Sequence, residues 1–203
     1  MNITDWLRKT FRGILECIAE FLNRLGVMPN TMTFLGLIGN IIAAYCISMD
    51  KMVSGGVIVL IMGPIDALDG TMARLRGEPT NYGAFVDSVT DRYSEIVILG
   101  GLMIYFLNSN NTNACFLVYA AAIGSVLISY VRARAESLDF EAKAGLLTRV
   151  ERYMVIVPSL LLKKPVIGLW IIAVLGNITA FQRIWCVRQQ ARRTFKKKNR
   201  KTK

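Results

Sequence analysis

Four aspartates fall within 26 residues of the chain, at Asp66, Asp69, Asp87 and Asp91. The stretches that carry them are otherwise rich in apolar residues and are predicted to be helices embedded in a membrane. A carboxylate in hydrocarbon is energetically costly, so acids in such segments are typical of functional sites. The chain has no His. Clustered carboxylates without imidazole favour a hard divalent cation with oxygen ligands, either Mg²⁺ or Mn²⁺.

The spacing of these acids predicts that they meet. Asp66 and Asp69 are three residues apart, and Asp87 and Asp91 are four apart, so each pair shares one helix face. The connection over residues 75–82 is short, which predicts antiparallel neighbouring helices. Four converging carboxylates repel one another unless cations intervene. One or two divalent ions among the four aspartates would relieve this repulsion, and two ions that share carboxylates suit displacement at phosphorus.

The elements that must position the acids are predicted from the apolar runs. Apolar residues make up 53% of the chain, the mean hydropathy is +0.40, and the runs are about 20 residues long, as in proteins that cross a bilayer several times. We predict an all-α integral membrane fold that forms one domain over residues 1–203. Its six-helix core covers residues 31–187, with transmembrane spans at 31–49, 53–74, 83–107, 113–135, 150–164 and 165–187.

The two flanks of this core have a different character. Apolar residues at spacings of three and four over residues 2–24, interrupted by charges, predict an amphipathic helix in the membrane interface. Residues 188–203 form a basic tail. The net charge of +11 is concentrated at segment ends and in this tail, which favours an anionic lipid leaflet over nucleic acid as the partner.

The charges of the loops predict the orientation. Cations gather in the segments expected on one side, whereas the other side carries only Lys51, Lys163 and Lys164. By the positive-inside rule the cation-rich side is cytoplasmic. Both termini and the aspartates are then predicted to face the cytoplasm, at the cell membrane.

Two runs of the sequence carry a family resemblance. Residues 66–74 and 83–91 match the pattern D-x-x-D-G-x-x-A-R, eight residues, G-x-x-x-D-x-x-x-D at every fixed position and gap. This pattern is similar to the signature of the CDP-alcohol phosphotransferases. The resemblance implies six transmembrane helices, usually in a homodimer, and an active site that opens to the cytoplasm. It also implies that Asp66, Asp69 and Asp87 bind metal, and that Asp91 is the general base and a candidate fourth ligand.

The same resemblance implies a site for a CDP-linked lipid, either CDP-diacylglycerol or an archaeal equivalent. The start of the first span is similar to the P-N-x-x-T element of the family. The residues implied in binding are Pro29, Asn30, Thr31, Met32, Thr33, Asp66, Asp69, Gly70, Ala73, Arg74 and Thr80. In the reaction an alcohol, deprotonated toward Asp91, attacks the lipid-side phosphorus and CMP departs, so that the protein mainly positions the groups and stabilises charge.

The acceptor alcohol has to be inferred from the arginines near three other helix ends. A phosphorylated acceptor would need such an anion pocket, although positive-inside anchoring explains Arg134 and Arg149 about equally well. Arg183 lies deeper than snorkelling explains. The runs Tyr130–Glu136 and Arg149–Arg152, with Gln182-Arg183, resemble the prokaryotic phosphatidylinositol phosphate synthases. This implies inositol 1-phosphate as the acceptor, with its phosphate held by Arg132, Arg152 and Arg183. The sequence departs from these enzymes at one point. They usually carry a glycine soon after the Ala-Glu pair that ends the first run, whereas residues 137–140 of this chain include none.

Other functions are compatible with parts of the pattern. Glycerol 3-phosphate is also an anionic phosphate ester, so a phosphatidylglycerophosphate synthase-like reaction uses the same chemistry. A divalent-cation transporter would need polar groups through the midplane, whereas the acids gather near one face. A structural scaffold gives no reason to keep four costly acids. The sequence therefore predicts a transferase of phospholipid biosynthesis.

Overall fold

The structure is a computed structural model that describes residues 3–77, 80–142 and 145–201. Over these ranges the chain forms seven helices and no strand, which confirms the all-α prediction. The helices are α1 (Ile3–Arg24), α2 (Pro29–Ser48), α3 (Met52–Leu75), α4 (Asn81–Asn108), α5 (Thr112–Glu136), α6 (Arg149–Leu161) and α7 (Pro165–Lys201). The ends of the predicted domain, residues 1–2 and 202–203, lie outside the described residues.

Four of the six predicted spans correspond to helices that are long and apolar enough to cross a bilayer: α2, α3, α5 and the Pro165–Arg193 part of α7. The helix α6 has 13 residues, about 20 Å at 1.5 Å per residue, against a hydrocarbon core of about 30 Å. The helix α4 has 28 residues, but its first half carries Asp87, Asp91, Arg92 and Glu95. The predicted third and fifth spans thus coincide with helices that are respectively too charged and too short to be identified as spans by length and composition.

Side-chain caps determine where two of the helices that carry site residues begin. The Thr80 hydroxyl accepts a hydrogen bond from the Gly83 N–H at 3.0 Å and starts α4. At the start of α6 the Glu151 carboxylate accepts from the Thr148 N–H at 2.5 Å, and also from the Thr148 hydroxyl. Such caps satisfy N–H groups that have no partner within the helix. They fix the starts of α4 and α6. Asp87 lies in the second turn of α4, and Arg149 is the first residue of α6.

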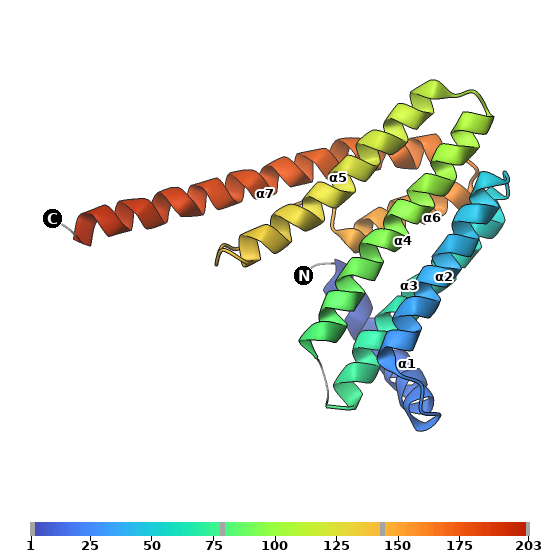
Figure 1. Ribbon diagram of the computed structural model, residues 1–203, viewed down its shortest axis with the longest axis horizontal. Helices are drawn as coiled ribbons and strands as arrows, with labels where there is room; N and C mark the ends of the chain where they lie inside the picture. Colours follow the sequence, from blue (N-terminus) through green and yellow to red (C-terminus); the bar gives the residue numbers. More distant parts are fainter. Residues whose placement is uncertain (1–2, 78–79, 143–144, 202–203) are drawn as a thin grey trace.

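The helices pack as two groups, α1 to α4 and α5 to α7. The groups meet where α3 contacts α6 and where α4 contacts α5. The helix α2 packs against both α3 and α4, and α5 packs against α7, while α6 contacts α3 and α7. Figure 1 shows α2, α3 and α4 side by side, with α5 along α7 and the C-terminal part of α7 extending away from the rest. Close contact between α2 and α4 depends on Gly101, because a Cβ there would lie 2.5 Å from the carbonyl oxygen of Ala44.

The first helix lies against the end of α3 that follows the aspartates. Ala19 is fully buried in a cluster with Leu68 and Met72. Arg76, just after α3, donates hydrogen bonds to the Asn23 side chain at 2.7 Å and to the Val27 carbonyl at 2.6 Å. Other apolar side chains of α1 are exposed, among them Ile14, Ile18 and Phe21. One apolar side of α1 is therefore used inside the protein and another is open to the surroundings.

The last helix extends beyond the predicted sixth span. That span was expected to end at residue 187, and α7 continues through the basic residues that follow it to Lys201. The residues beyond 187 are mostly Arg, Gln, Ala and Lys, which have high helix propensity, and they include no Gly or Pro. Nothing in the local sequence ends the helix at the predicted boundary.

Candidate active site

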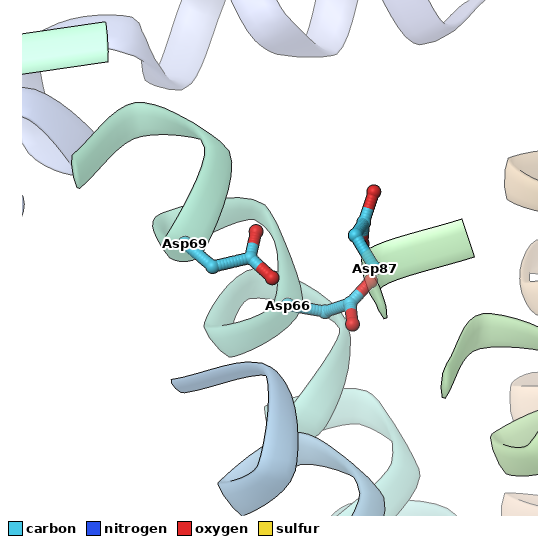
Figure 2. Close-up of side chains that lie close together, drawn as sticks. All are labelled: Asp66, Asp69 and Asp87. Carbon is cyan, nitrogen blue, oxygen red and sulfur yellow. The ribbon is translucent and has the colours of Figure 1, made fainter. Parts of the chain in front are cut away.

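Three carboxylates converge between α3 and α4. One oxygen each from Asp66, Asp69 and Asp87 lies within 4.8 Å of the other two. In Figure 2, Asp66 and Asp69 come from successive turns of α3, and Asp87 joins them from α4. The predicted convergence of the two acid pairs is thus present for these three residues, which we call the aspartate cluster.

Asp69 is oriented by neutral donors. The Thr33 hydroxyl of α2 donates to Asp69 Oδ2 at 2.5 Å, and the Gly70 N–H donates to Asp69 Oδ1 at 2.5 Å. The Asp69 residue is only 6% exposed. Because a buried carboxylate needs hydrogen-bond partners, α2 takes part in positioning a ligand on α3. Thr33 was predicted to bind the CDP-lipid, and here its hydroxyl contacts the acid itself.

Asp66 and Asp91 share one arginine. The Nη1 atom of Arg149 lies 2.7 Å from Asp66 Oδ2 and 2.6 Å from Asp91 Oδ1. Arg92 is also near Asp91, with its Nη1 atom 3.5 Å from Oδ2. Arg149 belongs to the first turn of α6, so this contact joins α3, α4 and α6 at one point. Asp91, the fourth predicted aspartate, is thus connected to the aspartate cluster through the guanidinium of Arg149.

The donor set fits a hard divalent cation. Carboxylate oxygens are the ligands that Mg²⁺ and Mn²⁺ prefer. With ligands at about 2.1 Å, opposite oxygens around such an ion stand about 4.2 Å apart, so the 4.8 Å spread of the aspartate cluster needs only a slight closing. Asp66, Asp69 and Asp87 are the residues that would hold the ion.

The residues predicted to bind the CDP-lipid surround the same end of α2, α3 and α4. A Cβ built at Gly83 would lie 3.1 Å from the Thr80 hydroxyl and 3.8 Å from Asn30 Oδ1, so the N-termini of α2 and α4 are adjacent. The Arg74 guanidinium donates to the Thr71 hydroxyl at 3.0 Å and the residue is exposed. Of the remaining predicted residues, Met32 is buried against α1 and α3, Thr31 is exposed, and Pro29, Gly70 and Ala73 are half-buried.

The arginines predicted for the acceptor lie on α5, α6 and α7. Arg183 lies within electrostatic range of Arg132, Arg152 and Glu136, so the three arginines gather in one region, which we call the arginine group. Arg183 donates to the Ile128 carbonyl at 2.7 Å. Arg132 is exposed and pairs with Glu136 at 2.8 Å.

The two arginines with weaker predicted roles make other contacts. Arg134 is exposed and its Nη1 atom is 3.5 Å from the Ser137 hydroxyl. Arg149 contacts the carboxylates described above. Within the described contacts, its guanidinium therefore belongs with the aspartates rather than with the arginine group.

Glu95 is a functional candidate that the sequence analysis did not identify. Arg152 donates from Nε to Glu95 Oε1 at 2.5 Å and from Nη2 to Oε2 at 3.0 Å, and both residues are largely buried. Glu95 follows Asp87 and Asp91 at intervals of four residues, so it shares their helix face. Continuing the spacing of the acids by one more step would have found it.

The sequence profile of the CDP-alcohol phosphatidyltransferase family matches residues 26–184, which include the aspartate cluster and most of the helical core. The chain belongs to this family. It is accordingly a membrane-bound transferase of phospholipid synthesis, in a family that uses divalent metal ions, and the predicted family is confirmed.

Several relatives are similar over most of the chain. An archaetidylinositol phosphate synthase of Pyrococcus horikoshii is 32% identical over 180 residues, which cover 88% of this chain and 93% of the relative. A phosphatidylinositol phosphate synthase of Cutibacterium acnes is 35% identical over 153 residues, 74% of each chain.

Solved structures of the phosphatidylinositol phosphate synthase of Mycobacterium tuberculosis share the fold at 29% identity. The structure with CDP-DAG bound has a TM-score of 0.80 and covers 86% of this chain and 93% of its own. The complex with manganese and citrate also has a TM-score of 0.80, with 85% and 88% covered.

Proposed function

We propose that the chain transfers the lipid phosphate group of a CDP-linked lipid to inositol 1-phosphate, releasing CMP and forming a phosphatidylinositol phosphate-type lipid. The observation that carries this proposal is the convergence of Asp66, Asp69 and Asp87 to within 4.8 Å. The names of the similar synthases support both substrates. The CDP-DAG and manganese found with the Mycobacterium tuberculosis enzyme support the donor and the type of metal.

The chain's own residues have separate roles in this reaction. Asp66, Asp69 and Asp87 hold one or two Mg²⁺ or Mn²⁺ ions, with Asp91 as a further candidate ligand. Bound there, the ions supply positive charge for the pyrophosphate and for the CMP that leaves. Asp91 accepts the proton of the acceptor hydroxyl. The hydroxyl oxygen then forms a bond to the lipid-side phosphorus, and the bond between that phosphorus and the CMP oxygen breaks. Asn30, Arg74 and Thr80 bind the cytidine end.

The acceptor is inferred from the arginine group. Arg132, Arg152 and Arg183 gather positive charge near one another, and a phosphate monoester on the alcohol would compensate it. Guanidinium groups bind phosphate oxygens through two parallel hydrogen bonds, which selects for such esters over neutral alcohols.

The membrane arrangement we propose has six crossings, with α4 and α6 added to the four helices of clear spanning length. The contact of Arg149 with Asp66 and Asp91 supports it, because it requires the start of α6 to lie on the same side as the end of α3 and the start of α4. Six crossings put both termini on the cytoplasmic side, with the active site. We further propose that α1 lies in the interface and that the single-domain chain forms a homodimer.

The decisive test of the proposed function is release of labelled CMP from CDP-diacylglycerol by the purified protein with Mn²⁺. We expect turnover with inositol 1-phosphate and little with inositol, serine or glycerol 3-phosphate. Comparable turnover with glycerol 3-phosphate and none with inositol 1-phosphate would overturn the acceptor assignment. A parallel series with an archaeal-type ether-linked CDP-lipid identifies the donor.

The role of Asp91 is tested by Asp91→Asn. This variant should still bind Mn²⁺ and the CDP-lipid but release no CMP, because the amide cannot take the hydroxyl proton. Full turnover in the variant would refute the assignment of Asp91 as the base.

A further inference from the structure

Arg149 contacts both a metal ligand and the base of the proposed reaction with a single nitrogen. Its Nη1 atom is 2.7 Å from Asp66 Oδ2 and 2.6 Å from Asp91 Oδ1. Charge-assisted contacts this short are strong in a partly buried site. One guanidinium thus links an oxygen of the aspartate cluster to the oxygen that should face the acceptor hydroxyl.

The backbone that carries Arg149 is held in place, but the side chain has room to move. The first turn of α6 is capped by the Thr148 and Glu151 pair, and the buried Arg152 is tied to Glu95. By contrast, the Arg149 side chain is 30% exposed. Its long flexible stem can therefore turn away from the carboxylates without moving the helix.

A divalent cation in the aspartate cluster opposes the observed position of Arg149. Both are positive and both are attracted to Asp66. If the cation binds Asp66 Oδ2 it replaces the guanidinium there, and if it binds the other oxygen the two like charges still repel across a few ångströms. The Asp91 oxygen is affected as well, since the Arg149 nitrogen 2.6 Å away occupies the space from which the hydroxyl of an alcohol would approach it.

We propose that Arg149 is an exchangeable internal counter-ion, which the divalent cation displaces from Asp66 and Asp91. Arg149 neutralises these two carboxylates in the arrangement seen here, and arrival of the metal both fills the aspartate cluster and uncovers the base. This inference rests on the proposed function in that Asp66, Asp69 and Asp87 hold the metal. Arg149 is then a positioning residue for Asp91.

The test is the affinity of the purified full-length protein for Mn²⁺, measured by the electron paramagnetic resonance signal of free Mn²⁺. Arg149→Gln removes the competing charge, so its Kd should fall about tenfold relative to the unaltered protein, the scale of one close like-charge interaction. The matched control is Arg12→Gln, which removes an exposed arginine paired with Glu16 at 2.7 Å and should leave the Kd unchanged.

The outcomes separate the inference from the proposed function. An unchanged or weaker affinity in Arg149→Gln would show that Arg149 is a permanent structural tie and would overturn the exchange. Failure of the unaltered protein to bind Mn²⁺ at all would refute the metal site, and the exchange with it.

A second measurement needs no variant and therefore does not depend on the variant's folding. Phenylglyoxal labels accessible guanidinium groups, and peptide mass spectrometry reports each position. Mn²⁺ should raise the labelling of Arg149 several-fold and leave Arg12 unchanged. Protection of Arg149 by Mn²⁺, or no effect on it, would contradict its release.

Discussion

The aspartate cluster and the arginine group compensate their charges in different ways. In the aspartate cluster, Asp69 is bound by the neutral donors of Thr33 and Gly70, and Asp66 shares one arginine with Asp91. In the arginine group, Arg152 has a full bidentate carboxylate partner. The carboxylates of the aspartate cluster are thus only partly compensated by cations of the protein. The buried Arg152 of the arginine group is already neutralised by Glu95.

This difference indicates what each region is prepared to bind. Carboxylates held within 4.8 Å of one another repel, and a cation that enters relieves the repulsion at once. An anion that approaches Arg152 must compete with Glu95 for Nε and Nη2, or bind the Nη1 side of the guanidinium. We therefore expect substitutions in the aspartate cluster to affect turnover most, and substitutions in the arginine group to affect stability and the acceptor KM.

The largest effect is expected from Asp69→Asn. The substitution keeps the volume of the side chain but removes a charge that we propose holds the metal, so CMP release should fall on the order of 10³-fold or more. The control is Asp50→Asn at an exposed turn where φ is 60°, a conformation that Asn also adopts readily. Comparable activities of the two variants would remove the distinction between the aspartate cluster and an ordinary surface acid.

The next largest effect is expected from Glu95→Gln, as a loss of stability. It leaves the buried Arg152 guanidinium without its carboxylate, which should lower the free energy of unfolding by about 3 kcal/mol. Thermal unfolding in detergent measures it. The control is Glu136→Gln, which breaks the exposed pair with Arg132 and should cost less than about 1 kcal/mol. Equal effects at the two positions would mean that burial does not distinguish the pairs.

A smaller effect is expected where α2 packs against α4 at Ala44, about three turns along α2 from Thr33 and the aspartate cluster. Gly101→Ala places a methyl group 2.5 Å from the Ala44 carbonyl oxygen, so α4 must shift from α2 at a cost of about 1–3 kcal/mol. Gly100→Ala is the matched control, because a Cβ there meets nothing within 4 Å. Unfolding curves of the two variants should differ clearly, and identical curves would show that the contact of α2 with α4 is not tightly packed.

The smallest effect on stability is expected from Arg132→Gln in the arginine group. Its exposed pair with Glu136 contributes less than about 1 kcal/mol to folding. If Arg132 binds the acceptor phosphate, the acceptor KM should still rise about tenfold, the equivalent of about 1.4 kcal/mol, with the KM for the CDP-lipid unchanged. Steady-state kinetics with each substrate varied in turn would decide, and a change confined to the CDP-lipid would contradict the assignment.

Local spacing predicted the helices and the convergence of the aspartates. Asp66 and Asp69 share one face of α3, and the short connection together with the packing of both α3 and α4 against α2 brings Asp87 beside them. The helix α7 continues past the predicted sixth span into the basic tail, because no local signal ends it there. The sequence predicted a span over 83–107, but α4 is not among the helices identified as spans by length and composition, because Asp87, Asp91, Arg92 and Glu95 make it polar.

The sequence by itself determined the family, the all-α fold and the convergence of three of the four acids, since these depend on motifs and on residues that are neighbours along one or two helices. Only the tertiary structure decided the partners of the arginines. Arg152 and Glu95 are separated by 57 residues, and Arg149 reaches Asp66 and Asp91 from a third helix. Such pairings depend on how α6 packs against α3 and lies beside α4, and no spacing within a helix encodes that geometry.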